Sequence, residues 1–211
     1  DPDVFMLRDE NSHFNQDEKY TLLLLNNTLG AVLFNSDDIR LYNDEQRILF
    51  RSIFPYQKPR IESIHSENQC YKIKLRVNQR RYIVFCNLSK QAINLSTGKG
   101  SFYDVQQNKC YHKPQEFLLK KHQSRLFYQI DTSQKIELLG GKNHLFSGQE
   151  IESISRTNDT ELVVKIRQNA QKNQGIHFWV ADPTVQYIRI NHQSIAVDKQ
   201  IASYGREKKK N

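Results

Sequence analysis

An alternation of apolar and basic residues at 71–77 constrains the fold of this chain more than any other feature. The segment runs Tyr71, Lys72, Ile73, Lys74, Leu75, Arg76 and Val77. Side chains two residues apart share a face of a β-strand, so the pattern predicts a strand with one face on a core and one in solvent. Asn78 and Gln79 then predict a hairpin turn before a continuously apolar strand at 82–86. The segment therefore predicts antiparallel pairing.

Short apolar runs separated by polar or glycine-containing turns continue through much of the chain. They predict further strands at 92–95, 102–105, 116–119, 126–130, 151–155, 161–166, 176–180 and 186–190. Many short antiparallel strands are typical of a sandwich or barrel. Gly140 and Gly141 predict a break between two β-rich regions. The pattern leaves open whether the region after this break completes the first sandwich or forms a second one.

The first 57 residues have a different, helical pattern. Asn15 and Glu18 form an N-x-x-E capping box, and Gly30 stands where a C′ glycine would end a helix. This predicts a helix at about 16–29. An apolar run at 31–34 follows and forms a short apolar segment after this helix.

A second capping box and a polar turn follow that apolar run. Asn43 and Gln46 predict the start of a helix at about 43–54, and Pro55 lies just past its expected end. The cluster Asn35-Ser36-Asp37-Asp38 suggests either metal or acid chemistry or a capping turn, and the turn is the better supported.

Charge and hydropathy limit the classes of partner. The net charge is +8 and the sequence pI is about 9.3, which raises the question of nucleic acid. The basic residues are mostly dispersed and no nucleic-acid-binding motif accompanies them, so we expect no nucleic-acid partner. The longest apolar run, 22–25, is too short to cross a bilayer, and no membrane association is expected.

Cysteine and histidine spacing argues against a metal centre. Cys70, Cys86 and Cys110 are widely spaced and form no C-x-x-C pair, and the seven histidines show no H-x-x-H pattern. We expect free, mostly buried thiols, a cytoplasmic location and no metal or cofactor. A serine nucleophile is not indicated either, because no G-x-S-x-G elbow is present.

The opening segment holds two carboxylates around a proline. Proline fixes φ and lacks an N–H, so Asp1 and Asp3 are expected at a strand end or turn, where a carboxylate can be aimed into a pocket. The competing interpretation is a turn with a capping aspartate. The segment has no initiator methionine and no leader, so we expect the chain to begin inside a longer protein.

Three blocks within residues 1–55 resemble a known enzyme family. These are DPDVFMLRDEN, DEKYTLLLLNNTLGAVLFNSDDI and DEQRILFRSIFP. Together they resemble the closing part of the catalytic (β/α)₈ barrel of melibiase-type α-galactosidases, in glycoside hydrolase clan D. That family shows an N-D-P-D segment, an apolar residue and L-R, then a helix and an S-D-D or S-D-N turn. An antiparallel β-sandwich follows the barrel in this family.

The resemblance implies a retaining mechanism with two aspartates about 5–5.5 Å apart. In the family both lie upstream of D-P-D, so no catalytic residue is expected in this chain, which we predict to be inactive alone. By the same resemblance, Asp3 and Val4 line the galactose pocket and Asp1 holds the loop. Arg8 is expected to be a structural ion-pair partner. The implied partners are α-galactoside oligosaccharides, bound by the parent enzyme.

The fold class expected is therefore mainly β, an antiparallel β-sandwich preceded by the last strand-loop-helix elements of a (β/α)₈ barrel. The expected regions are the barrel tail at 1–57, a sandwich domain at 58–133, and a β-rich region at 134–211 with a basic disordered tail at 205–211. Exposed apolar faces on the two helices would favour a homo-oligomer.

One alternative function remains, a non-catalytic β-sandwich that binds carbohydrate or another protein. Trp179, Tyr103 and Tyr111 could stack on sugar rings, but aromatic residues on strands are more often core residues.

Overall fold

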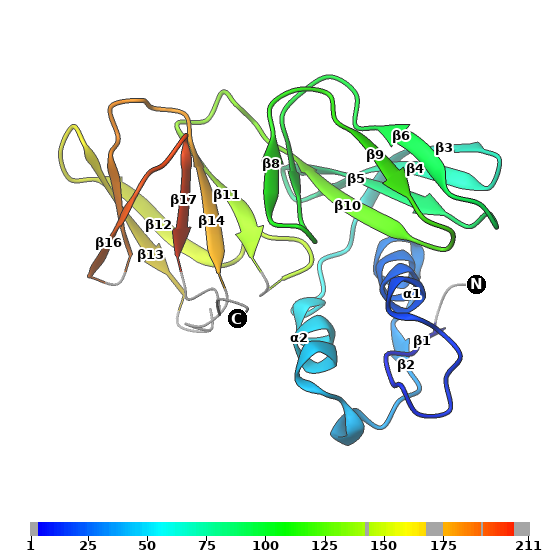
Figure 1. Cartoon of the computed structure of the whole chain (residues 1–211). Helices are drawn as coiled ribbons and strands as arrows, with labels where there is room; N and C mark the ends of the chain where they lie inside the picture. Colours follow the sequence, from blue (N-terminus) through cyan, green and yellow to red (C-terminus); the bar gives the residue numbers. More distant parts are fainter. Residues whose placement is uncertain (1–3, 142–143, 168–174, 191, 205–211) are drawn as a thin grey trace, which may run out of the picture. The chain divides into compact units, whose positions relative to one another are not determined.

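The computed structural model describes residues 4–141, 144–167, 175–190 and 192–204. Asp1, Asp3 and the basic tail at 205–211 therefore lie outside the described residues. The chain divides into two compact units, Asp1–Gln129 (unit 1) and Ile130–Asn211 (unit 2). Both consist mainly of antiparallel β-sheet, which confirms the expected fold class (Figure 1).

Unit 1 is built on a six-stranded sheet with the order β3-β4-β5-β10-β7-β8. Its strands are β3 (Arg60–Glu67), β4 (Cys70–Val77), β5 (Arg80–Asn87), β7 (Phe102–Asp104), β8 (Lys109–Tyr111) and β10 (Ser124–Gln129). A separate two-stranded sheet pairs β6 (Ile93–Ser96) with β9 (Glu116–Leu119).

The alternating segment forms β4, as predicted. Ile73, Leu75 and Val77 are buried, and Lys74 between them is exposed. Asn78 adopts a left-handed φ of 54° in the predicted hairpin turn to β5. β5 is buried almost continuously because both faces of the sheet are covered.

One face of the sheet packs against β6 and β9 through an aromatic core. Phe85, Phe117 and Phe127 meet with ring centroids 5.2–5.8 Å apart. Aromatic pairs at such distances stabilise a core beyond the area they bury. The other face is contacted by α1 (Gln16–Leu29) of the N-terminal helical segment (Figure 1).

This segment contains α1 (Gln16–Leu29), α2 (Asp44–Ser52), a 3₁₀ turn at Ile39–Leu41, and the strands β1 (Val4–Phe5) and β2 (Phe34–Asn35). Both predicted capping boxes are present in full, at Asn15 with Glu18 and at Asn43 with Gln46. Gly30 ends α1 as predicted, but with φ of −65°, so the left-handed conformation expected of a C′ glycine is not used.

Unit 2 has two sheets and a core of its own. The sheets have the orders β11-β14-β17 and β12-β13-β15-β16. Their strands are β11 (Ile136–Gly141), β12 (Ile151–Arg156), β13 (Glu161–Ile166), β14 (Ile176–Val180), β15 (Tyr187–Ile190), β16 (Gln193–Ala196) and β17 (Ile201–Tyr204). Phe178, Ile188 and Ile190 are fully buried at the centre.

The predicted break at Gly140 and Gly141 is wrong, because both residues lie inside β11. The register shifts between Leu138 and Gly140, and Gly141 pairs with Ile176. A side chain at Gly141 would collide with the carbonyl oxygen of Gly175. Gly141 is therefore needed for the close approach of two strands, and it does not mark a turn.

Neither helix within the described ranges is long and apolar enough to cross a membrane.

Candidate functional site

The β1–α1–β2 segment is the part of unit 1 in which the resemblance placed site residues. β1 and β2 pair in parallel, with Val4 opposite Phe34 and Phe5 opposite Asn35. Parallel strands need a crossover connection, and α1 supplies it. In sheets of this kind functional groups collect after the carboxyl ends of the strands. Here those ends lead into residues 6–10 and 36–38.

Asp37 ties these two segments together. Its Oδ2 accepts hydrogen bonds from the backbone N–H of Leu7 at 2.5 Å and of Arg8 at 3.1 Å, and from the Tyr42 hydroxyl at 2.6 Å. Its side chain is fully buried, and Arg8 Nε lies 3.6 Å from Oδ1. Burial and the neighbouring Asp37 carboxylate raise the pKa of Tyr42. Asp37 is therefore a structural clamp, which confirms both the predicted turn and the ion-pair role of Arg8.

A second carboxylate, Asp9, is more accessible. It pairs with Lys19, whose side chain is buried, and accepts a hydrogen bond of 3.0 Å from Gln46 Nε2. The hydrogen bond from Lys19 is the largest cause that lowers the pKa of Asp9. Asp9 is thus ionised at neutral pH, which suits a hydrogen-bond acceptor and not a general acid.

Sequence reasoning missed this cluster. The sequence indicates Gln46 as a member of a capping box. In the structure its side-chain oxygen accepts the Asn43 N–H, and its nitrogen also donates a hydrogen bond of 2.7 Å to the Leu7 carbonyl. That contact joins residues 39 positions apart, and no local pattern indicates it. The charged run Arg8-Asp9-Glu10 after an apolar segment was the only available signal.

Of the three predicted site residues, only Val4 is described; Asp1 and Asp3 lie outside the described residues. Val4 is 46% exposed, and its register partner Phe34 is 57% exposed. The Val4 carbonyl accepts a hydrogen bond of 3.2 Å from the buried Asn26 of α1. Its backbone is therefore anchored while its side chain lies on an open apolar face.

The opposite face of the same strand pair is closed. Phe5 is buried, and its ring packs against Phe50 of α2 at 6.3 Å between centroids. Phe50 of α2 contacts the pair from this side, and Asn26 of α1 holds the backbone of β1. Within the described residues, the Phe5 face of the β1–β2 pair is therefore covered, and Val4 and Phe34 are exposed on the other face.

The aromatic residues considered for sugar stacking are mostly in the core. Trp179 and Tyr103 are buried, so neither offers a ring face to a ligand. Tyr111 is half-buried and donates a hydrogen bond to Gln107 Oε1 at 3.1 Å. The interpretation of strand aromatics as core residues is confirmed for Trp179 and Tyr103.

Over the described ranges, no three His, Cys, Asp or Glu side chains lie close enough to hold a metal ion. The three cysteines are free, as predicted. Burial raises the pKa of the Cys86 thiol to about 11 and that of Cys110 to about 12, so both are protonated at neutral pH.

No protein-family model matches the sequence, and no curated protein sequence matches it significantly. Solved structures do match. A candidate α-galactosidase/melibiase from Bacteroides fragilis aligns with a TM-score of 0.50 at 11% identity, over 57% of this chain and 30% of that chain. The chain shares the fold of part of a melibiase-type enzyme.

Two further structures align with TM-scores of 0.48. One is α-galactosidase I from Mortierella vinacea, at 12% identity over 60% of this chain and 38% of that chain. The other is a family 27 β-L-arabinopyranosidase from Geobacillus stearothermophilus, at 14% identity over 60% of this chain and 34% of that chain. The alignments cover between 30% and 38% of the lengths of these three structures. At such low identity the likeness concerns the fold alone.

Proposed function

We propose that this chain is the C-terminal part of a retaining glycoside hydrolase that removes terminal α-linked galactose from oligosaccharides in the cytoplasm. The observation that supports this most directly is the one-sided β1–α1–β2 unit. The D-P-D-V segment leads directly into its first strand.

A parallel pair with one bare face is an incomplete structure. Parallel sheets occur almost only with both faces covered, and isolated two-stranded sheets are marginal. In a (β/α)₈ barrel, helices cover the outside, and the inward side chains of the strands fill the interior. The helix-covered face with Phe5 corresponds to the outside of such a barrel, and the open face with Val4 and Phe34 corresponds to its interior.

In this proposal the two strands close a barrel whose other strands precede Asp1. The nucleophile and the general acid come from those preceding strands. Asp3 binds a sugar hydroxyl or supports the catalytic pair, Asp1 holds the loop, and Val4 lines the pocket. Asp37 and Gln46 act at a distance from the sugar, by joining the segments after β1 and β2.

The test compares two proteins on p-nitrophenyl α-D-galactoside. One is this chain, and the other is the same chain extended by the sequence that precedes it in its gene. We expect turnover from the extended protein only. Robust turnover by the chain alone would overturn the assignment of the catalytic pair to preceding strands, and inactivity of a folded extended protein would overturn the proposed substrate.

A variant in the extended protein tests Asp3. Asp3→Asn is expected to lower kcat/KM by about 100-fold, in the range seen when one transition-state hydrogen bond is lost. The matched control is Asp38→Asn, because Asp38 pairs with the exposed Arg40 and caps the 3₁₀ turn. Equal activities of the two variants would show that Asp3 does not contact the sugar.

A further inference from the structure

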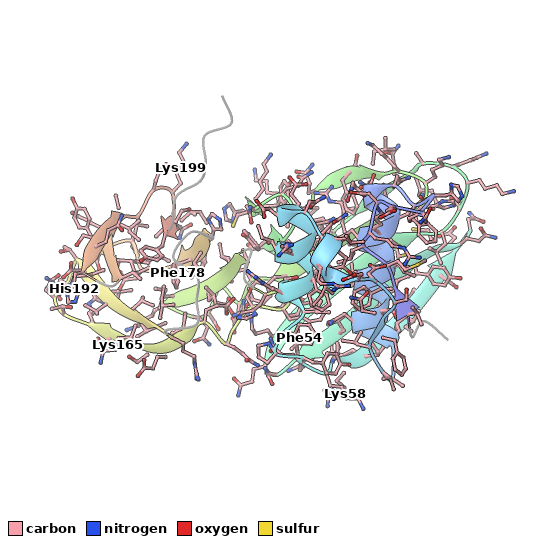
Figure 2. The ribbon with its side chains drawn as sticks, turned by 90° about the horizontal axis from the view of Figure 1, so that it is seen from below. Phe54, Lys58, Lys165, Phe178, His192 and Lys199 are labelled. Carbon is pink, nitrogen blue, oxygen red and sulfur yellow. The ribbon has the colours of Figure 1, made fainter. Side chains whose placement is uncertain are left out.

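Unit 2 has a hollow of about 470 Å³ on its four-stranded sheet, lined by Val163, Val164, Lys165, Arg189 and His192. Small-molecule sites commonly have volumes of about 300–1,000 Å³. Lys165 and His192 appear at the same end of unit 2 in Figure 2. The hollow lies outside the barrel-like segment of unit 1, and none of the roles proposed above involves it.

The strand register explains which side chains face this hollow. β13 and β15 pair in parallel, with Val163 opposite Arg189. Leu162, Val164, Ile188 and Ile190 are buried in the core. Because side chains alternate along a strand, Val163, Lys165, Tyr187 and Arg189 lie on the outer face.

The charge on this face is positive. Arg189 Nη2 lies 3.1 Å from Glu161 Oε2, and Glu161 also accepts a hydrogen bond of 3.3 Å from Ser194. Within the described part of unit 2, Lys165 and His192 make no ion pair. The outer face therefore carries two permanent positive charges, on Lys165 and Arg189, and one negative charge, on Glu161. The imidazole of His192 lies beside them.

An aromatic ring extends the same face. Tyr187 is 45% exposed and lies opposite Glu161, two residues before Arg189. At about 3.3 Å per residue, the positions of Tyr187 and Lys165 are separated by about 13 Å along the strands. The face therefore presents the Tyr187 ring at one end, Val163 and Arg189 in the middle, and Lys165 and His192 at the other end.

We propose that this outer face binds an acidic carbohydrate, a short chain of sugar rings bearing carboxylate or sulfate groups. The acidic groups bind Lys165, Arg189 and His192 by charge-assisted hydrogen bonds. The apolar face of a neighbouring sugar ring stacks on Tyr187. The proposal does not depend on the function proposed for unit 1.

A nucleic acid fits this surface less well. Binding a phosphate backbone takes a long track of Lys and Arg, with aromatic residues at successive bases. Here Glu161 lies beside Arg189, and Tyr187 is the single aromatic residue on the outer face of the described β13–β15 pair. The short positive face favours a small anionic ligand.

Calorimetric titration of the full chain tests the proposal with defined probes. Trigalacturonate supplies carboxylates and galactose 6-sulfate supplies a sulfate, and fully methyl-esterified trigalacturonate is the neutral match. We expect at least one acidic sugar to bind about tenfold more tightly than the ester. Binding of neither acidic sugar, equal binding of the ester, or binding of a single-stranded RNA oligonucleotide alone would overturn the proposal.

Two substitutions locate the site. Lys165→Gln and Tyr187→Ala are each expected to weaken binding about tenfold. Lys199→Gln makes the same charge change at an exposed residue of unit 2 that lies away from Lys165 and His192, and should leave binding unchanged (Figure 2). Equal weakening by Lys199→Gln and Lys165→Gln would show unspecific attraction, and so would overturn the assigned site. Thermal unfolding of each variant confirms that it is folded.

Discussion

Arg125 and Asp104 form the most deeply buried ion pair among the described residues of unit 1. The Asp104 side chain is fully buried and that of Arg125 is 10% exposed. Asp104 Oδ1 also accepts backbone hydrogen bonds from Gln106 and Gln107, at 3.0 and 2.9 Å. The Arg125 guanidinium lies over Phe117 at 4.7 Å from the ring centroid. The effect of such a pair on stability is largest when one partner is removed, because the remaining charge is then buried without a counter-ion.

Removing Arg125 alone should strongly destabilise unit 1. Arg125→Met leaves the Asp104 carboxylate buried without a cation, and we expect a loss of about 3–5 kcal/mol in the free energy of unfolding. The double variant Arg125→Met with Asp104→Asn removes both charges and should recover much of this loss. Urea unfolding monitored by the far-UV circular dichroism signal of the helices measures the effect on unit 1, because both described helices lie in that unit.

The control for this prediction is Arg40→Gln. Arg40 pairs with Asp38 at the surface, where solvent screens the interaction, so no measurable change is expected. A loss for Arg125→Met no larger than that for Arg40→Gln would contradict the prediction.

At the residue scale the sequence indicated roles that depend on near neighbours. The capping role of Asn15, the turn at Asp37 and the ion-pair role of Arg8 follow from local chemistry. The contacts of Asp104 with Arg125, and of Gln46 with Leu7, depend on which strands and helices meet. No spacing within the sequence encodes those pairings.

Helix α1 is held on the sheet by its first turns. Glu18 accepts the backbone N–H of Asn15 at 2.9 Å and also contacts Nδ1 of His122 at 2.8 Å. Asp17 accepts a hydrogen bond of 3.0 Å from Gln123, and Thr21 donates one of 3.0 Å to the His122 carbonyl. One glutamate therefore both caps the helix and docks it.

The docking of α1 should depend on pH. The hydrogen bond with His122, followed by that with Asn15, lowers the pKa of Glu18 below its ordinary value of 4.5. A lowered folded-state pKa gives stability that is present above the unfolded-state pKa and lost as the pH falls through the folded-state pKa. As the pH falls from neutrality through the range in which Glu18 becomes protonated, unit 1 of His122→Asn should therefore lose less stability than unit 1 of the unchanged chain.

Urea unfolding by helical circular dichroism across this pH range provides the measurement. His65→Asn is the matched control, because His65 is exposed on β3. If both His122→Asn and His65→Asn lose as much stability at acid pH as the unchanged chain, the contact between Glu18 and His122 does not cause the acid sensitivity.

At the element scale, strong periodicity and capping boxes predicted well. The bounds of α1, β9, β13 and β14 match the predicted segments. β3, β8, β16 and β17 were not assigned, because they are short or largely solvent-exposed and show no clean alternation. β11 was missed because its two glycines resemble a turn, although they serve a close strand contact.

At the scale of the whole molecule, each unit has a hydrophobic core of its own. One core is centred on Phe85 and Phe127, and the other on Phe178 and Ile188. Sequence patterns predicted a division between β-rich regions at 58–133 and 134–211, but they left open whether the second region completes the first sandwich or forms one of its own. Pairing between distant strands decides that division.

Separate cores predict separate unfolding transitions. Ile188→Ala removes a fully buried side chain from unit 2 and should cost about 2–5 kcal/mol there. Trp179 is the sole tryptophan, and it is buried in unit 2, so its fluorescence reports that unit. Ile188→Ala should shift the fluorescence transition and leave the helical signal unchanged, and Arg125→Met should do the reverse. Equal shifts of both signals by either variant would mean that the units unfold as one.

The contacts that dock α1 also impose an order on events during synthesis. Thr21, Glu18 and Asp17 meet partners 101, 104 and 106 positions later in the chain. The helix therefore leaves the ribosome long before its docking surface exists. Its capping box needs only residues 15–18, so the helix can start to form without help from the sheet. The same glutamate that starts the helix is then in place when His122 arrives.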